Sequence, residues 1–288
     1  MDAYREANRR LWAEWTHVHE RSDFYRLETF KRGDTLDRPF DAAPGVRVRG
    51  YEVEEIGDVA GKDLLHLQCH FGIDTLSWAR LGARVTGIDF SAEAIELATR
   101  LAGELGIDAR FVVSTVEDLP SSLDASFDLV YTSRGAIWWL ADLDRWAKVI
   151  AHFLRPGGFF YVTEFHPVIQ TLDEAADVTE PRVVYPYFPR AEPLEFPVYG
   201  SYADPSAKID STVEYGWVHS IGEVVTAVAG AGLRIDFLHE MDWVDYRMIP
   251  LLEEGDDGKW RLPSTVAGEL PLMFSLRASK ADTERIAE

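Results

Sequence analysis

The stretch from Lys62 to Asp89, KDLLHLQCHFGIDTLSWARLGARVTGID, decides the fold of this 288-residue chain. Its apolar runs 64–67 and 85–88 predict two buried strands. Asp89 stands at the carboxyl end of the second strand. Strand, turn, helix, strand and acid, in this order, is the layout of a nucleoside-binding half of a doubly wound α/β fold, in which the acid accepts hydrogen bonds from ribose hydroxyls.

The segment between the two strands predicts a turn at 68–72 followed by a helix. Gly82 can end that helix. The start of the helix offers unpaired N–H groups to a ligand. The apolar side of the helix includes Ile73, Leu76, Trp78 and Leu81.

Strands and helices continue to alternate downstream. Further helices are predicted at 92–105, 142–153 and 221–229, with N-caps at Ser91 and Ser220 and a stop at Gly106. Further strands are predicted at 110–113, 127–131, 159–163, 233–238 and 270–276. The segment 31–50 is rich in Gly, Pro, Asp and Arg and predicts a loop, and 241–263 shows no clear period.

Two downstream motifs make the series specific. The strand Phe127-Asp128-Leu129-Val130-Tyr131 is followed by a helix, the turn Arg155-Pro156-Gly157-Gly158 and another strand. With Asp89, this series resembles the class I S-adenosylmethionine (SAM) dependent methyltransferases. The resemblance covers roughly residues 62–164. It implies a Rossmann-like, mostly parallel sheet with an antiparallel last strand, and SAM as the cofactor.

The turn after the first strand departs from that family's pattern. The family has an acid and three glycines here, whereas this chain has His66, Gln68 and His70 in place of the acid and two of the glycines, and only Gly72 matches. Glycine permits positive φ and close backbone approach to a ligand. The replacements predict that the methionine end of the pocket is tighter, or that SAM lies slightly further out.

The resemblance also implies which residues contact the ligands. The expected cofactor-binding residues are Gln68, Cys69, His70, Gly72, Asp89, Phe90, Thr115, Val116, Glu117 and Ser133. The expected substrate-binding residues are Tyr25, Arg134, Trp138, Tyr215 and Trp217.

Glu164 and His166 are the candidate catalytic residues, because a general base helps when the methyl acceptor must lose a proton. Glu164 ends the strand 159–163 among phenylalanines, where burial raises a carboxyl pKa. His166 is two residues on, so both side chains point to the same side of an extended segment. The alternatives are that Glu164 orients SAM or pairs with Arg134, and that His166 is structural.

The chain divides into four parts by pattern. Residues 1–60 predict an N-terminal helical lid and linker, 61–166 the SAM-binding core, and 219–288 the completion of the sheet. Residues 167–218 are rich in proline and aromatic residues and predict a substrate-binding insertion with a hairpin through 198–202 and 209–215. The alternatives are a helix packed on the core edge for 2–24, and an oligomerisation arm for the insertion.

Composition limits the partners. A formal net charge of −20 argues against nucleic acid and anionic membranes. The single cysteine, Cys69, forms no intrachain disulfide and indicates a cytoplasmic protein. No signal segment, membrane-spanning run or metal site is expected; His66 and His70 flank a turn, and Cys69 between them does not complete a tetrahedral set.

The sequence therefore predicts a methyltransferase acting on an oxygen or nitrogen atom of a small molecule, with carbon as a further acceptor. One rival is a NAD-dependent oxidoreductase, which the absence of a Gly-x-Gly-x-x-Gly turn disfavours. The other is a degenerate SAM-binding module that regulates a partner, which the lost glycines suggest. The sequence does not name the acceptor.

Overall fold

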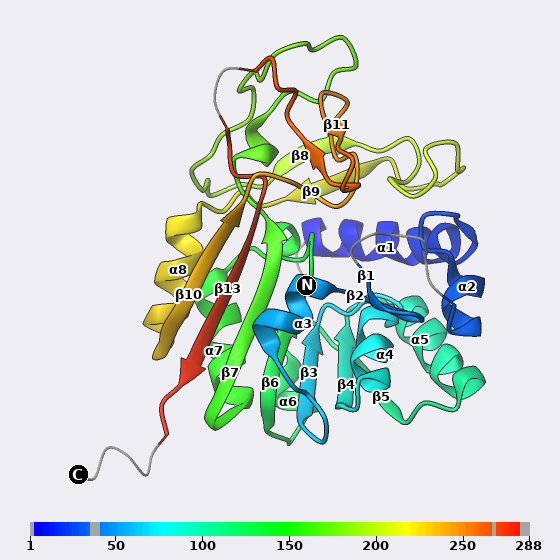
Figure 1. Ribbon diagram of the computed structural model, residues 1–288, viewed down its shortest axis with the longest axis vertical. Helices are drawn as coiled ribbons and strands as arrows, with labels where there is room; N and C mark the ends of the chain where they lie inside the picture. Colours follow the sequence, from blue (N-terminus) through cyan, green and yellow to red (C-terminus); the bar gives the residue numbers. More distant parts are fainter. Residues whose placement is uncertain (1–2, 35–40, 267–268, 283–288) are drawn as a thin grey trace.

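The computed structural model describes residues 3–34, 41–266 and 269–282, and a seven-stranded sheet forms its core (Figure 1). The strand order is β10-β13-β7-β6-β3-β4-β5. The bounds are β3 Asp63–Leu67, β4 Arg84–Asp89, β5 Ala109–Val113, β6 Phe127–Thr132, β7 Leu154–Phe165, β10 Leu233–Met241 and β13 Met273–Lys280. The final strand, β13, is antiparallel to both neighbours, whereas β3 to β7 pair in parallel. The predicted sheet is thus confirmed.

Helices cover both faces of the sheet, because alternate residues of a buried strand point to opposite sides. One face carries α3 (Gly50–Ile56), α4 (Ile73–Arg80) and α5 (Ala92–Leu105), and the other carries α6 (Leu119–Ser122), α7 (Leu143–Phe153) and α8 (Ile221–Gly230) (Figure 1). Leu64 and Tyr131 pack on the α3–α4 side, and their neighbours Leu65 and Val130 pack on the side of α6, α7 and α8.

The strand order creates a switch point between β3 and β6. The chain leaves β3 toward α4 on one face and leaves β6 toward α7 on the other. The two connections therefore diverge at the carboxyl ends of the strands and leave a crevice there, which is the usual ligand site of such sheets.

The predicted helix caps are present. The Ser91 hydroxyl accepts a hydrogen bond from the Ala94 N–H at 3.2 Å, and the Ser220 hydroxyl accepts one from the Glu223 N–H at 3.2 Å. Gly106 ends α5 in the left-handed conformation. These local signals fix where each helix begins or ends and hence where the strand ends lie.

A second layer lies over the carboxyl ends of the strands. Figure 1 shows α1 (Ala3–Arg21) crossing this edge beneath the hairpin of β8 (Leu194–Pro197) and β9 (Val213–Gly216). Asn8 of α1 donates to the Tyr215 carbonyl at 2.7 Å and accepts from the Tyr215 N–H at 2.9 Å, so it acts as an extra strand partner. The Trp15 indole N–H donates to the Gly200 carbonyl at 2.8 Å. Helix and insertion therefore pack as one unit.

The prediction of a loop over 31–50 is wrong in part. This segment contains the end of α2 (Leu27–Arg32) and the paired strands β1 (Asp41–Ala43) and β2 (Val46–Arg49). Residues 35–40 lie outside the described residues. Val46 and Val48 are buried against the α4 side of the sheet. Their burial holds this segment in extended form. The composition of the segment, which is rich in turn-forming residues, does not reveal that burial.

Other predicted element boundaries also differ from those in the structure. The insertion hairpin pairs 194–197 with 213–216 instead of 198–202 with 209–215, and the last strand is 273–280 instead of 270–276. Helix α6 and the short strands β11 (Glu253–Glu254) and β12 (Trp260–Arg261) were not expected from the sequence. Two turns of 3-10 helix, η1 (Ile137–Trp139) and η2 (Ile169–Thr171), follow β6 and β7. Long-range pairing decides such ends, and no local residue marks them.

Within the described part of the chain, none of the helices combines the length and apolar character needed to cross a membrane.

Candidate active site

A cavity of about 940 Å³ is lined by residues that follow the central strands and by residues of α1 and the β8–β9 hairpin. Its volume lies within the range of about 300–1,000 Å³ that is typical of small-molecule sites. The predicted site residues that line it are Tyr25, Gln68, Cys69, His70, Gly72, Asp89, Phe90, Thr115, Val116, Glu117, Ser133, Arg134 and Trp138. The predicted residues outside its lining are Glu164, His166, Tyr215 and Trp217.

The turn after β3 has positive φ angles at two positions that are not glycine, as well as at Gly72. Gln68 has φ 55° and His70 has φ 51°, and Gly72 follows with φ 79°. A non-glycine residue in this conformation costs roughly 1–2 kcal/mol. Gly72 has a second constraint, because a Cβ there would lie 2.8 Å from the Phe111 ring.

Side-chain contacts hold this strained turn in place. The Gln68 side-chain amide donates to the Ala136 carbonyl at 2.8 Å. The rings of His70 and His19 join through Nε2 and Nδ1 at 2.8 Å, and His19 Nε2 lies 2.6 Å from the Ser201 hydroxyl. Burial lowers the pKa of His19 to about 3, and burial also holds the pKa of His70 well below its usual range. The neutral pair thus links the turn to α1 and the insertion.

Asp89 lies in the cavity wall at the end of β4. Its carboxylate accepts hydrogen bonds from the His70 N–H at 2.8 Å and the Ser91 N–H at 2.9 Å. Burial raises the pKa of Asp89 to about 6, and these backbone amides oppose the rise. A buried carboxylate with further acceptor capacity, held at the edge of a cavity, can bind hydroxyl groups of a ligand.

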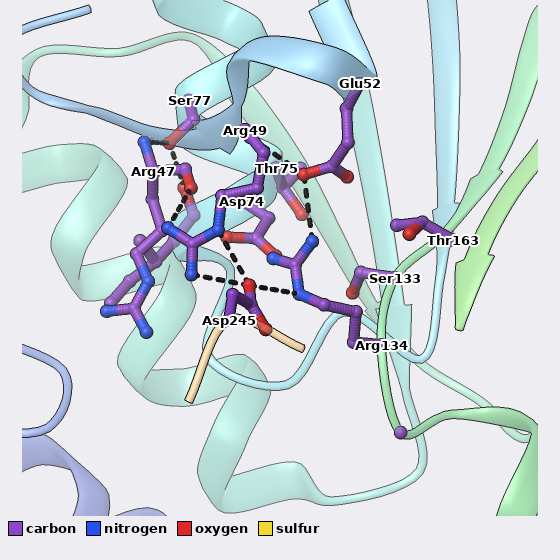
Figure 2. A network of polar contacts seen from close by, with 12 residues as sticks. Arg47, Arg49, Glu52, Asp74, Thr75, Ser77, Ser133, Arg134, Thr163 and Asp245 are labelled. Atoms are coloured by element: carbon purple, nitrogen blue, oxygen red, sulfur yellow. Dashed lines mark hydrogen bonds and ion pairs between the residues drawn. The ribbon is translucent and has the colours of Figure 1, made fainter. Parts of the chain in front are cut away.

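A buried ion-pair network forms the wall beneath the turn (Figure 2). Arg49 and Asp245 approach to 2.8 Å with side chains only 3% and 2% exposed. Arg134 lies 2.9 Å from Glu52 and 3.4 Å from Asp245. Burial alone would raise the pKa of Asp245, but Arg49 and Arg134 hold it well below its usual range.

The network bears on two expectations about Arg134, which lines the cavity. Its guanidinium points to Glu52 and Asp245, so its charge is already neutralised where a substrate contact was predicted (Figure 2). Within the described part of the chain its ion pairs are with Glu52, Asp74 and Asp245, and not with Glu164, the partner considered from the sequence. The network joins β2, α3, the end of β6 and the segment around Asp245. It therefore sets the shape of this part of the cavity wall.

Glu164 lies outside the cavity lining and is 2% exposed. Its carboxylate accepts the N–H groups of Gly135, Ala136 and Ile137 at 2.5, 2.8 and 3.0 Å and that of Phe165 at 2.7 Å. Burial raises its pKa, and these amides oppose the rise. The geometry favours a structural role, in which Glu164 holds the loop after β6, over the predicted role of a base.

His166 is also buried outside the cavity lining. Its Nδ1 accepts the Val168 N–H at 3.2 Å, and its Nε2 lies 3.0 Å from the Glu240 carboxylate. Burial lowers its pKa, and Glu240 opposes this shift. These contacts favour the structural alternative for His166.

The predicted substrate contacts Tyr215 of β9 and Trp217, which follows β9, pack against α1 and not into the cavity. Tyr215 packs against Tyr4 of α1 with ring centroids 4.8 Å apart, and Trp217 packs edge-on to the same ring at 6.4 Å. Neither lines the cavity, whereas Glu214 does. The pleat explains this correction: successive strand residues face opposite sides, so Glu214 faces inward and Tyr215 faces α1.

Sequence reasoning missed several cavity residues. Arg47, Arg49 and Asp245 come from segments without a recognisable motif, and Glu214 and Glu174 come from the insertion. No local pattern distinguishes these acids from the many surface acids of a chain with 49 Asp and Glu residues. Strand alternation along 213–216 was the one available signal, and it requires the correct hairpin register.

Four polar atoms of cavity-lining residues have no hydrogen-bond partner within the described residues: Trp12 Nε1, Gln68 Oε1, His70 Nδ1 and Asp245 Oδ1. Buried polar groups are normally paired, so this wall suits a ligand that carries both donors and acceptors. The described residues hold no group of three or more His, Cys, Asp or Glu side chains arranged around a metal ion.

Comparison with known proteins agrees with this geometry. Residues 65–162 match the family model described as "Methyltransferase domain". Ubiquinone biosynthesis O-methyltransferases are similar in sequence: that of Cronobacter sakazakii is 33% identical over 112 residues, covering 39% of this chain and 46% of that protein. That of Xanthomonas euvesicatoria is 33% identical over 155 residues, covering 51% and 64%. The chain thus matches about half the length of these curated relatives.

Among solved structures, a SAM-dependent methyltransferase from Mesorhizobium loti superimposes with a TM-score of 0.55 at 18% identity, covering 80% of this chain and 96% of that one. Residues 65–162 thus resemble a methyltransferase domain, and the fold of the chain is that of SAM-dependent methyltransferases. The match over 65–162 and the fold agree with the methyltransferase resemblance predicted from Asp89, the Phe-Asp-x-Val strand and the Pro-Gly-Gly turn.

Proposed function

We propose that this protein transfers a methyl group from SAM to an oxygen or nitrogen atom of a small organic molecule, with carbon as a further acceptor. The observation that carries the proposal is the position of Asp89 and the turn 68–72, side by side in the wall of a large cavity at the switch point of a class I fold. The donor supplies a methyl group activated by its sulfonium, and the chain supplies alignment.

The cavity residues suit this cofactor. Asp89 would accept the ribose hydroxyls, and the unpartnered Gln68 Oε1 and His70 Nδ1 would face its methionine end. Residues 114–117 follow β5 and would border the adenine, with Val116 against the ring and a polar neighbour toward the amino group. Phe90, Cys69 and Ser133 complete the proposed cofactor wall.

A direct assay tests the function. Release of S-adenosylhomocysteine (SAH) is measured with SAM and a panel of small phenols, carboxylates and amines, alongside calorimetric titration with SAM and NAD. We expect SAM to bind, NAD not to bind, and at least one acceptor to release SAH. Binding of SAM without turnover on a broad panel supports the regulatory module instead, and NAD binding without SAM binding supports the oxidoreductase.

Replacing Asp89 by Asn is expected to weaken SAH binding by about 1–3 kcal/mol, because charge-assisted bonds to the ribose are lost. In the wild type, affinity should fall as the pH drops below about 6, since the pKa of Asp89 is raised to about 6 and the protonated acid is a weaker acceptor. The variant should lose this step. Calorimetry between pH 5 and 8 measures both, with the exposed Asp108→Asn as control. An unchanged affinity in the folded variant would place the ribose elsewhere.

We also propose how the four parts of the chain are organised. The contacts of Asn8 and Trp15 with the insertion support a joint lid of 1–60 and 167–218 over the core 61–166, which 219–288 complete. The acidity of the chain supports a small-molecule partner and no nucleic acid or membrane partner. Homo-oligomerisation through the insertion and a cytoplasmic location stay predictions from the sequence.

A further inference from the structure

One end of the cavity is walled by aromatic rings from three separate segments. Trp138 of η1 and Phe196 of β8 have ring centroids 5.8 Å apart, and Phe196 and Tyr185 have centroids 5.1 Å apart with planes at 62°. All three line the cavity. We call these three residues the aromatic cage. In such pairs the edge of one ring packs on the face of the next, so the rings support one another and keep other parts of their negative faces for the cavity that they line.

Glu214 is an acidic residue that lies next to the aromatic cage. It pairs with Phe196 in the β8–β9 register and therefore lies on the same side of the hairpin. Burial raises the pKa of Glu214 to about 7; the charge of Glu174 adds to this rise, and a hydrogen bond from the Trp138 side chain opposes it. Glu174 also lines the cavity. The carboxyl group of Glu214 thus lies beside aromatic rings, and the exposed Glu174 is near enough for its charge to act on it.

The cage is fixed before any ligand enters. The Trp217 N–H donates to the Trp138 carbonyl at 2.9 Å. The Trp138 ring packs so closely on β9 that a Cβ on Gly216 would lie 1.7 Å from it. A glycine is required at this close approach. Preorganised walls reduce the conformational entropy that binding has to overcome.

In the described part of the chain, the charged group that acts on Glu214 is another acid, Glu174. Among the described residues, no lysine or arginine contributes to the pKa of Glu214, which is set by burial, Glu174 and Trp138. A carboxylate in an apolar wall is unfavourable without a positive partner. Aromatic faces attract cations as well, and desolvated cation–π contacts contribute about 2 kcal/mol.

We propose that the aromatic cage and Glu214 bind a positively charged amine or quaternary ammonium group of the methyl acceptor. The identity of this group as part of the acceptor rests on the proposed function, whereas the cation site itself does not. The cage lies on η1 and the insertion, apart from Asp89 and the turn 68–72 at the carboxyl ends of β4 and β3. The acceptor class is therefore a cationic small molecule.

The test compares matched probes by calorimetry, with the protein free and saturated with SAH. Benzyltrimethylammonium is expected to bind at least tenfold more tightly than neutral benzyl alcohol. Glu214→Gln should weaken the cation at least tenfold and leave SAH affinity unchanged, and Trp138→Leu should also weaken it. Glu195→Gln is the control, because Glu195 is exposed and pairs with Tyr215 on the opposite side of the hairpin.

A pH series gives a second readout. The probe has a fixed charge, so its affinity should fall as the pH drops through about 7 and Glu214 becomes protonated. Equal binding of cation and alcohol, or an unchanged cation affinity in Glu214→Gln that still binds SAH, overturns the proposal. If the wild-type protein binds the cation but does not bind SAH, the proposed cation site is supported and the proposed methyl transfer is contradicted.

Discussion

Replacing Asp245 by Asn is expected to lower the free energy of unfolding by about 3–5 kcal/mol, the largest loss that we expect from a single substitution in this chain. Asp245 carries the charge that faces both Arg49, at 2.8 Å, and Arg134, at 3.4 Å. Asn keeps the volume but removes the charge that faces Arg49, while Arg134 keeps its ion pairs with Glu52 and with the more distant Asp74. Uncompensated charge in a buried site is the cause of the expected loss.

Chemical denaturation monitored by tryptophan fluorescence measures this loss. Asp242→Asn is the matched control on the same segment, since Asp242 is 51% exposed and lies 3.4 Å from Arg261. An exposed pair of this kind contributes less than about 1 kcal/mol. If both variants lose the same small amount, the buried network does not contribute to stability in the way that its burial indicates.

The pH dependence has a defined sign. The pKa of Asp245 is lower in the folded protein than its ordinary value, so its contribution to stability is present above that value and is lost as the pH falls toward the folded pKa. The wild type should therefore lose stability on acidification more steeply than Asp245→Asn. A parallel loss in the two proteins would contradict the depressed pKa.

Glu164→Gln is the second large effect. The Glu164 carboxylate accepts four backbone amides, three of them from the successive residues 135–137. Gln offers one acceptor oxygen and turns an NH₂ group toward the remaining donors. Each buried amide left without an acceptor costs about 1–3 kcal/mol, so the free energy of unfolding should fall by at least about 2 kcal/mol.

Kinetics separate this role from that of a base. Because Glu164 does not line the cavity, turnover per folded molecule should keep the wild-type pH profile. A base would instead give a loss of ~10²–10⁴-fold in the catalytic constant with stability intact. The exposed Glu96→Gln on α5 is the control for a charge loss alone. Normal stability with a collapsed catalytic constant would restore Glu164 to the mechanism.

Local chemistry in the sequence determined the frame of this protein. The buried runs of β3 and β4, the caps Ser91 and Ser220, and the stop at Gly106 each act within a few residues, so the pattern alone located them. Asp89 was placed correctly at the cavity because the end of a parallel strand is a local feature. The fold class follows from this order of elements.

Tertiary structure decided the site in detail. Arg49 and Asp245 are 196 residues apart, and no pattern in either segment announces their pairing. The register of β9 directs Glu214 into the cavity and Tyr215 toward α1, and a shift of one residue would reverse that choice. Gln68 and His70 keep a glycine-like backbone because contacts with Ala136 and His19 hold them there. Pairings between distant segments have no local signature, so only the folded chain reveals which side chains share the cavity.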